Sequence, residues 1–200
     1  MAVNRVPVLK RCRSLDLDPV YLGIDKKSRR TARNANKKVS EYGLQLRAKQ
    51  QAKFMYGVLE KPFRNYYDKA SKMKGMVGEN LLTILETRLD NVLFRAAMAR
   101  TRMEARQIVD HKEVLVNGKC VNIPSYRVSA GDVIELKDAA KASPRYKAED
   151  GILASTEGRA VPEWLEADRE NLKITVSQLP NRKQIDVPFD EMLIVELYSK

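Results

Sequence analysis

The stretch HKEVLVNGKCV, residues 111–121, constrains the fold of this chain more than any other. Its Asn117-Gly118 pair separates two short runs of β-forming residues, VLV and KCV. A two-residue Asn-Gly loop is a strong hairpin signal because a type I′ turn requires positive φ at both central residues. Counting outward from the turn places Leu115 opposite Cys120, and we expect Leu115→Asp to unfold the hairpin. Since so small a hairpin is marginally stable alone, it must pack on another element.

The preceding segment ARTRMEARQIVDH, residues 99–111, predicts a short basic helix. Thr101 and Glu104 match a capping box, so the helix should begin at about Arg102. Arg102 and Arg106 are four residues apart and therefore share one face of the helix, which we expect to be solvent-exposed. On this interpretation Arg106→Ala weakens the binding of a polyanion without loss of the fold. The residues expected to face the core are Ala105, Ile108 and Val109.

The chain before this helix shows helical periodicity from Glu41 onward. Pro62 suits the first turn of a second helix, which Gly75 and Gly78 are expected to end. A third helix is predicted over residues 80–99. The apolar faces of the three helices are formed by Leu44, Ala48, Ala52 and Met55, then Phe63, Tyr66, Ala70 and Met73, then Leu81, Leu85, Leu89, Val92 and Ala96.

After the hairpin, IPSYRVSAGDVIEL, residues 123–136, predicts a loop, a turn at Gly131-Asp132 and another strand. The unit over residues 88–137 can therefore bury one apolar side. Its other side would present Arg102, Arg106, Lys112, Lys119 and Arg127. We expect an α+β fold, in which a mostly helical domain accompanies a small domain of helices packed on a short antiparallel sheet.

The charge of the chain indicates a polyanion partner. Lys and Arg number 37 and Asp and Glu 26, which gives a net charge of +11. Residues 1–40 carry +8, residues 41–137 carry +6 and residues 138–200 carry −3. The basic run at 26–38 is typical of an arm that folds on RNA. Anionic membrane is the weakest candidate, because no apolar run approaches the roughly 18 residues of a spanning helix.

The residues for other kinds of chemistry are scarce. Two cysteines, Cys12 and Cys120, and one histidine, His111, cannot supply the four ligands of a structural zinc site, and we expect no cofactor or metal. Both thiols are interpreted as inert, with Cys120 half-buried opposite Leu115. The chain has neither a Walker A loop nor a G-x-G-x-x-G fingerprint, and a single histidine leaves few options for acid–base catalysis. We therefore predict a protein that is not an enzyme.

The stretch RLDNVLF…TRMEARQIVDHKEVLVNGKCVNIPSYRVSAGDVIEL resembles the RNA-binding domain of the ribosomal protein S4 family. YGLQLRAKQ, YGVLEKPFRNYY, GENLL and the terminal LIVELYSK resemble the bacterial members of that family outside the domain. The resemblance implies a cytoplasmic, structural protein of the small ribosomal subunit. It further implies primary binding of small-subunit ribosomal RNA, early assembly of the five-prime domain, and an influence on decoding accuracy. The implied partners are that RNA, small-subunit protein S5, other small-subunit proteins, and messenger RNA where it enters the ribosome, but no membrane.

The resemblance also implies which residues contact RNA. The candidates in the S4-type domain are Arg102, Arg106, His111, Lys112, Asn117, Lys119, Ser125, Tyr126 and Arg127. Those of the basic arm are Arg11, Arg13, Arg29, Arg30, Arg33, Lys37 and Lys38, and those of the helical segment are Arg47, Lys53 and Arg64. Many relatives carry four zinc-binding cysteines near the N-terminus, whereas this chain keeps only Cys12, which indicates a zinc-free branch.

The expected domains follow from the same comparison. They are a basic arm (1–40), a helical domain (41–87) completed by 185–200, the S4-type domain (88–150) and its extension with further strands (151–184).

Three rival interpretations were weighed. Pseudouridine synthases also carry such domains and a catalytic R-L-D triplet, but Asp90 of Arg88-Leu89-Asp90 lies in an amphipathic helix and lacks the Thr-x-Gly context of those enzymes. We interpret Asp90 as structural and paired with a nearby basic residue. The second is a free RNA-binding regulator or a ribosome-rescue factor with the same domain. The helical segment 41–86 and the LIVELYSK ending favour a ribosomal protein instead. A DNA-binding protein would require a recognition helix suited to the major groove.

Overall fold

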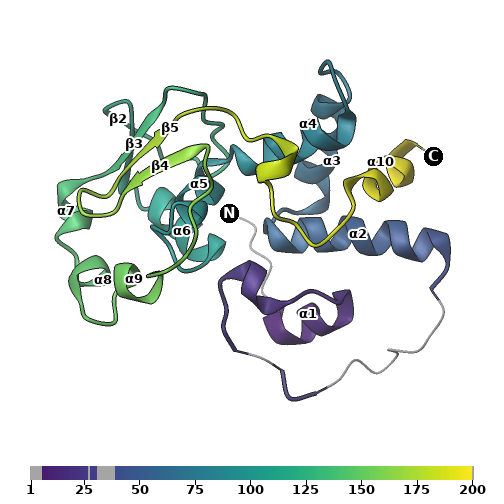
Figure 1. Cartoon of the computed structure of the whole chain (residues 1–200), viewed down its shortest axis with the longest axis horizontal. Coiled ribbons are helices and arrows are strands. Elements are labelled where there is room, and N and C mark those ends of the chain that lie inside the picture. Colours follow the sequence, from purple (N-terminus) through teal and green to yellow (C-terminus); the bar gives the residue numbers. More distant parts are fainter. Residues whose placement is uncertain (1–5, 27, 31–38, 200) are drawn as a thin grey trace. The chain divides into compact units, whose positions relative to one another are not determined.

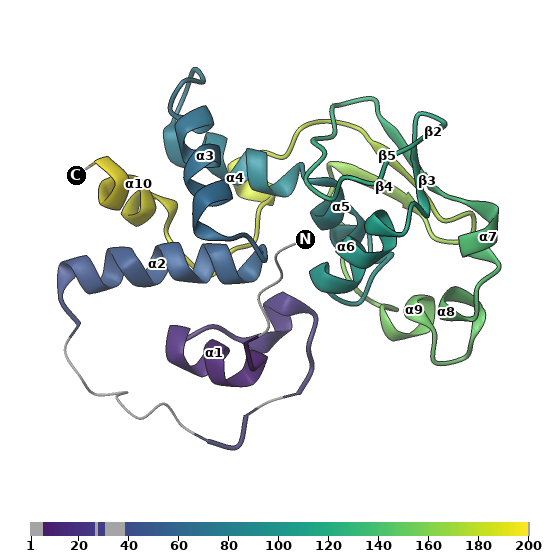
Figure 2. The same ribbon diagram turned by 180° about the vertical axis from the view of Figure 1, so that it is seen from behind.

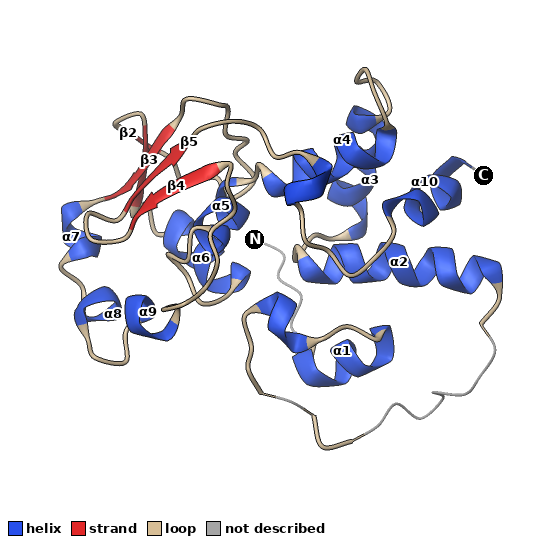
Figure 3. Ribbon diagram, in the orientation of Figure 1, coloured by secondary structure: helices blue, strands red, loops and turns tan. Residues whose placement is uncertain are grey.

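The computed structural model describes residues 6–26, 28–30 and 39–199, so the candidate residues Arg33, Lys37 and Lys38 lie outside the described part. The expected α+β class is confirmed, since helices accompany one antiparallel sheet (Figures 1 and 3). The chain forms two compact units. The first comprises the described residues of 1–82 and 186–200, and the second comprises residues 83–185. Within the described residues, no helix is both long and apolar enough to cross a membrane.

The first unit is helical. Its elements are α1 (Val8–Leu15), the short 3-10 helix η1 (Pro19–Leu22), α2 (Glu41–Met55), α3 (Glu60–Ala70), the first part of α4 (Val77–Glu86) and α10 (Glu191–Ser199). Ser40 caps α2, because its side-chain oxygen accepts a hydrogen bond from the Gly43 amide at 3.2 Å. Pro62 lies in the first turn of α3, as predicted. Helix α10 packs against α2, so the end of the chain completes this unit.

The apolar faces of α2 and α3 are only partly as predicted. Ala48, Ala52, Met55, Phe63 and Ala70 are buried and Tyr66 is half-buried.

The predictions for Leu44 and Met73 are wrong, since these side chains are 44% and 40% exposed. The buried face of α2 instead includes Gln45 and Gln51. The amide of Gln51 donates to the carbonyl of Leu15 at 2.7 Å and that of Gln45 to Glu196 at 3.1 Å. Buried amides are tolerated when they are hydrogen-bonded in this way, and a count of apolar residues cannot anticipate them.

Gly78 does not end a helix, which corrects a further prediction. It lies in the first turn of α4, and α3 already ends at Ala70. A Cβ atom at Gly78 would lie 2.7 Å from the Cγ atom of Glu191 at the start of α10. The absence of a side chain therefore allows α10 to approach α4 closely.

The second unit combines helices with the sheet. Its elements are the rest of α4, α5 (Leu89–Arg95), α6 (Arg102–Asp110), β1 (Val114–Val116), β2 (Lys119–Cys120), β3 (Val133–Leu136), α7 (Asp138–Lys141), α8 (Pro144–Lys147), α9 (Ile152–Ser155), β4 (Leu165–Asp168), β5 (Lys173–Val176) and the 3-10 helix η2 (Arg182–Gln184). The sheet has the order β2-β1-β3-β5-β4, and neighbouring strands are antiparallel. Helices α5 and α6 contact each other and pack on one face of it (Figures 1 and 2).

The hairpin prediction is confirmed. Leu115 pairs with Cys120, and φ is +49° at Asn117 and +76° at Gly118, as a type I′ turn requires. The expectation that Cys120 is half-buried is wrong, because its side chain is exposed. Alternation along a strand places Leu115 and Cys120 on the outer face of the sheet, whereas Val114 and Val116 point into the core.

Two helices replace the single one predicted over residues 80–99. Helix α4 ends at Glu86 and α5 begins at Leu89, because Arg88 has an extended backbone and forms an isolated antiparallel bridge with Arg127. The apolar positions predicted for this segment are nevertheless all fully buried: Leu81, Leu85, Leu89, Val92 and Ala96.

The predicted start of α6 is confirmed. The Thr101 hydroxyl accepts a hydrogen bond from the Glu104 amide at 3.2 Å, and the helix begins at Arg102. The second half of the capping box is displaced by one residue, since the Glu104 carboxylate accepts from the amide of Arg100, at 2.7 Å, rather than from that of Thr101. The three residues expected to face the core are buried, namely Ala105, Ile108 and Val109.

These orientations give a prediction for the hairpin. Val114→Asp places an unpaired carboxylate at a fully buried position and should cost more than about 4 kcal/mol. The expectation that Leu115→Asp unfolds the hairpin is corrected, because this side chain is only half-buried on the outer face. Leu115→Asp is therefore the matched control and should keep the native transition. The measurement is thermal unfolding followed by the fluorescence of Trp164, which is buried in the core of the same unit. Equal loss of stability in both variants would contradict the assigned faces.

Candidate nucleic-acid interface

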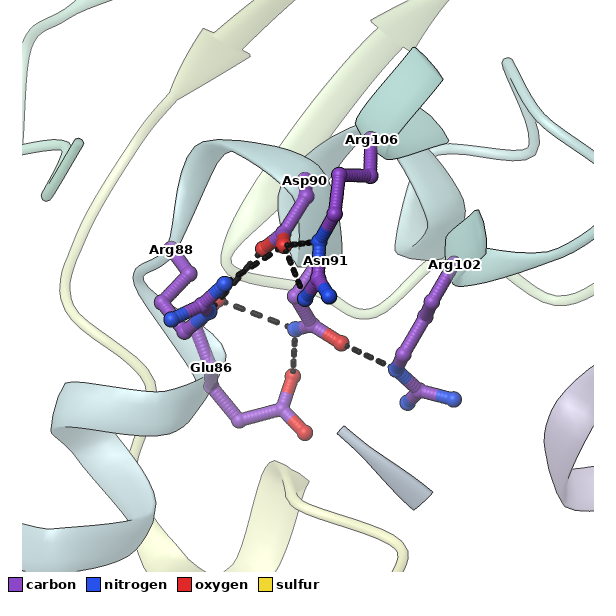
Figure 4. Close-up of polar contacts among 6 residues, drawn as sticks. All are labelled: Glu86, Arg88, Asp90, Asn91, Arg102 and Arg106. Carbon is purple, nitrogen blue, oxygen red and sulfur yellow. Dashed lines mark hydrogen bonds and ion pairs between the residues drawn. The ribbon is translucent and has the colours of Figure 1, made fainter. Parts of the chain in front are cut away.

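A buried ionic network joins α5, α6 and the residues just before α5 in the second unit (Figure 4). At its centre is the carboxylate of Asp90, which is 2% exposed. Arg88 donates to both carboxylate oxygens, at 3.0 and 2.6 Å. Arg106 of α6 donates twice to Oδ2, at 3.0 and 2.8 Å. The interpretation of Asp90 as structural and paired with basic residues is confirmed.

A second branch of the network joins α4 to α6 through Asn91. The Asn91 amide donates to the carboxylate of Glu86 at 2.7 Å, and its oxygen accepts from Arg102 at 2.7 Å (Figure 4). Arg95 binds the two oxygens of Glu86 at 3.0 and 2.7 Å. The guanidinium of Arg102 also stacks on the ring of Phe94, 4.1 Å from its centroid. Arg88 and Arg106 thus bind the carboxylate of Asp90, Arg95 binds that of Glu86, and Arg102 joins the network through the side-chain oxygen of Asn91.

The expectation that Arg102 and Arg106 lie on a solvent-exposed face is therefore wrong. Arg102 is 6% exposed, and the side chain of Arg106 is 14% exposed. Their four-residue spacing does place them on one face of α6, but that face meets α5 and its polar groups. Within the fold, both guanidinium groups hold α6 against α5, Arg102 through Asn91 and Arg106 through Asp90.

The loop between β2 and β3 is held against the start of α5. The amide of Leu89 donates to the carbonyl of Tyr126 at 2.9 Å, and the amide of Asp90 to that of Pro124 at 3.1 Å. These bonds satisfy amides that the first turn of a helix otherwise leaves without partners. The side chains of Ser125, Tyr126 and Arg127 remain exposed on a loop whose backbone is fixed.

The end of α6 and the hairpin carry further exposed candidates. His111 follows the last turn of α6, and Lys112 adopts positive φ, +61°, so the chain reverses into β1. Asn117 uses its side chain within the fold: it donates to Asp132 at 2.8 Å and accepts from the Val133 amide at 2.9 Å. Lys119 is exposed on β2, at one edge of the sheet.

The structure thus separates the predicted contacts into groups. The exposed candidates are His111, Lys112, Asn117, Lys119, Ser125, Tyr126, Arg127, Arg29, Arg30 and Arg64, and the half-buried ones are Arg11, Arg13, Arg47, Lys53 and Arg106. Arg11 donates to Gln50 at 3.1 Å and Arg13 to the carbonyl of Leu9 at 3.4 Å, so both have partners within the first unit. The exposed residues are therefore the candidates whose side chains can reach RNA without a change in the fold.

Lys53 belongs to a separate cluster in the first unit. The carboxylate of Glu60 binds Lys49 at 3.0 Å, Lys53 at 2.6 Å and the hydroxyl of Tyr198 at 2.9 Å. Burial alone would raise the pKa of Glu60, but these three hydrogen bonds outweigh it and lower the pKa to about 2. The ring of Tyr198 lies 4.7 Å from that of Tyr67. Lys53 therefore ties α2 to α3 in this structure.

One exposed arginine was missed by the sequence analysis. Arg100 precedes the cap of α6, and its guanidinium donates to the carbonyl of Asp150 at 3.1 Å. Because it is an exposed cation beside the start of α6, we add it to the candidates to be tested.

Comparison with known proteins identifies the family of the chain. Residues 87–134 match the S4 domain family, and residues 4–86 match the ribosomal protein S4/S9 N-terminal domain. The chain is 73% identical over 200 residues to small ribosomal subunit protein uS4 of Lachnospira eligens, 70% identical to that of Agathobacter rectalis, and 67% identical over 201 residues to that of Lachnoclostridium phytofermentans. Each match covers 100% of both chains. The chain belongs to the ribosomal protein S4 family.

Membership of the S4 family establishes the general role. S4-family proteins are structural, non-enzymatic constituents of the small ribosomal subunit, which they join by binding its RNA and other ribosomal proteins. In bacteria this places the chain in the cytoplasm, on the ribosome. The predicted family and the prediction that the chain is not an enzyme are confirmed.

The buried network overturns the expectation that Arg106→Ala leaves the fold unaffected. Removal of this guanidinium leaves the Asp90 carboxylate buried with Arg88 alone and should cost about 3 kcal/mol of unfolding free energy. Lys119→Ala, at an exposed position, is the control and should change stability by less than about 0.5 kcal/mol. Urea unfolding followed by Trp164 fluorescence makes the comparison. A fully stable Arg106→Ala protein would show that the network does not hold the unit together.

The Glu60 cluster predicts an acid dependence of the first unit. Because the pKa of Glu60 is lowered in the folded state, its ionised form stabilises above about pH 4.5, and this contribution is lost as the pH falls toward 2. Glu60→Gln should lower the protection of α2 and α3 from amide hydrogen exchange at pH 6, and the difference from wild type should disappear toward pH 2. Glu149→Gln, at an exposed position, is the control. A difference that persists at low pH would contradict this assignment.

Proposed function

We propose that this S4-family protein is a primary binder of small-subunit ribosomal RNA, that it nucleates assembly of the five-prime domain, and that it contributes to translational accuracy near the channel through which messenger RNA enters. The observation that carries the proposal is that His111, Lys112, Lys119, Ser125, Tyr126 and Arg127 are all exposed, at the end of α6, on the hairpin, and on a loop whose backbone is hydrogen-bonded to the start of α5. We call these six residues the hairpin surface.

The hairpin surface suits folded RNA for two reasons. Its cations neutralise phosphates, and the ring of Tyr126, 37% exposed, can stack on an unpaired base. Its backbone is also rigid, because the turn of the hairpin is tied to Asp132 and the loop 123–127 to α5. A rigid surface loses little conformational entropy on binding and can discriminate between RNA shapes.

Arg102 and Arg106 act beneath this surface in the proposed mechanism. Their hydrogen bonds to Asn91 and Asp90 hold α6 against α5, and so keep the exposed cations at the end of α6 in a defined position. The proposed further contacts are Asn117 in the same domain, Arg11, Arg13, Arg29, Arg30, Arg33, Lys37 and Lys38 in the arm, and Arg47, Lys53 and Arg64 in the helical segment.

The proposal also assigns domains and partners. The S4-type domain, 88–150 with its extension 151–184, would make the shape-specific contact, and the helical domain, 41–87 with 185–200, and the arm, 1–40, would extend it. Small-subunit protein S5 and incoming messenger RNA are the proposed neighbours. Support for these finer assignments comes from the resemblance of the motifs to those of the S4 family.

Binding to the five-prime domain of small-subunit ribosomal RNA, over a salt series, tests the proposal. Wild-type protein should prefer this RNA to an unrelated structured RNA of equal length, and the preference should survive as salt rises. The triple variant Lys112→Ala, Lys119→Ala, Arg127→Ala should bind this RNA more weakly. The slope of the logarithm of its binding constant against the logarithm of salt concentration should also be shallower, by roughly 0.7 to 0.9 for each phosphate contact that is lost.

The control is Lys141→Ala, Lys147→Ala, Lys183→Ala, which removes the same charge from the second unit outside the hairpin surface. It should retain the preference for the five-prime domain. Equal weakening by the two triple variants, or equal affinity of wild type for both RNAs, would reduce the chain to a non-specific RNA-coating protein and overturn the proposal.

A further inference from the structure

The sheet of the second unit has two chemically different edges. Its order, β2-β1-β3-β5-β4, places β2 with Lys119 at one edge and β4 at the other (Figure 3). Strand β4 pairs with β5 alone, and Leu165 and Ala167 turn toward the core while Glu166 and Asp168 are exposed. Within the described residues no other strand of the sheet covers the outer side of β4. An edge strand of this kind can accept an additional strand.

The register shows which backbone groups face outward. The carbonyl of Trp164 accepts from the amide of Ser177 at 3.1 Å, so alternate residues of β4 direct their polar groups toward β5. By the same alternation, the amide and carbonyl of Ala167 point away from β5. The amide of Leu165 is already bonded to Pro162, which limits the added strand to the Ala167 side.

The side chains of this segment are strongly acidic, although the exposed Lys173 of the neighbouring strand β5 lies opposite Asp168. Residues 157–170 contain five exposed carboxylates: Glu157, Glu163, Glu166, Asp168 and Glu170. The two arginines of the segment turn inward. Arg159 donates to the carbonyls of Ala99 and Arg100, and Arg169 donates to that of Leu153 at 2.6 Å. The edge therefore presents negative charge on a chain whose net charge is +11.

We propose that β4 is a docking edge for a Lys- and Arg-rich extended segment of another protein of the small subunit. A strand added at Ala167 would bring every second side chain beside Glu166 and Asp168, which selects cations at those positions. Phosphate groups are repelled by the same carboxylates, so RNA is the wrong occupant. The complementary charge would favour association and partner choice.

The test uses the full-length protein and a short synthetic peptide in which Lys alternates with Thr, with a Glu–Thr peptide as the negative probe. Amide chemical-shift changes on titration with the Lys–Thr peptide should centre on residues 165–168. Glu163→Lys, Glu166→Lys should weaken its binding about tenfold or more. This variant keeps Asp168, which forms the turn with Asn171 at 2.7 Å, so the strand itself should stay folded.

The matched control is Glu149→Lys, Asp150→Lys, which makes the same change of charge at exposed positions between α8 and α9. It should bind the Lys–Thr peptide like wild type. Equal weakening by both variants, or shift changes spread over all acidic residues, would mean non-specific attraction and would overturn the proposal. So would the absence of any change, since the charges of the edge would then serve only to prevent sheet-to-sheet aggregation.

A second measurement separates protein from RNA as the occupant. A photo-reactive amino acid placed at position 166 and carried into purified small subunits should cross-link to a basic segment of one neighbouring protein, and Glu163→Lys in the same chain should reduce the yield. A cross-link to ribosomal RNA would overturn the docking edge. It would leave the proposed RNA contact of the hairpin surface untouched, because Lys119 of that surface lies on β2, at the opposite edge of the sheet from β4.

Discussion

The buried carboxylate of Asp90 joins the parts of the second unit that carry the candidate RNA contacts. It accepts hydrogen bonds from Arg88 before α5 and from Arg106 in α6, while the amide of the same residue donates to Pro124 in the loop that follows the hairpin. Burial of such a charge is costly unless all of its partners are in place. The arrangement of two helices and a loop is therefore fixed as a set, and exposed cations on it keep defined positions.

The sequence predicted correctly those parts of the fold that depend on residues no more than about four positions apart in the chain. The Asn117-Gly118 turn requires positive φ whatever surrounds it, so the strands and their register followed. The cap of α6 depended only on Thr101 and Glu104. The α+β class was predictable for the same reason, because helical periodicity before residue 100 and β-forming runs after it are both local patterns.

The errors arose where distant residues decide the outcome. The spacing of Arg102 and Arg106 predicts that they share a face, but Asp90 and Asn91, 16 and 11 residues upstream, determine that this face is buried. The break at Arg88 was equally invisible, because apolar residues continue through α4 and α5 and the extended backbone is matched by a bridge to Arg127. Contacts between residues more than ten positions apart produce no periodic pattern in the sequence, so periodicity could not predict them.

Net charge is a poor measure of what such a protein offers to RNA, since many of its cations are used inside the fold. Arg88, Arg95 and Arg106 neutralise buried carboxylates, and Lys49 and Lys53 bind Glu60. Among the exposed charges of the second unit, Lys119 lies on β2 at one edge of the sheet, and Glu166 and Asp168 lie on β4 at the other edge. A sheet with edges of opposite charge has a preferred orientation in the field of a polyanion, because phosphates attract one edge and repel the other. Segregation of the exposed charges, rather than their total, would therefore direct the hairpin surface toward RNA and leave the far edge for protein.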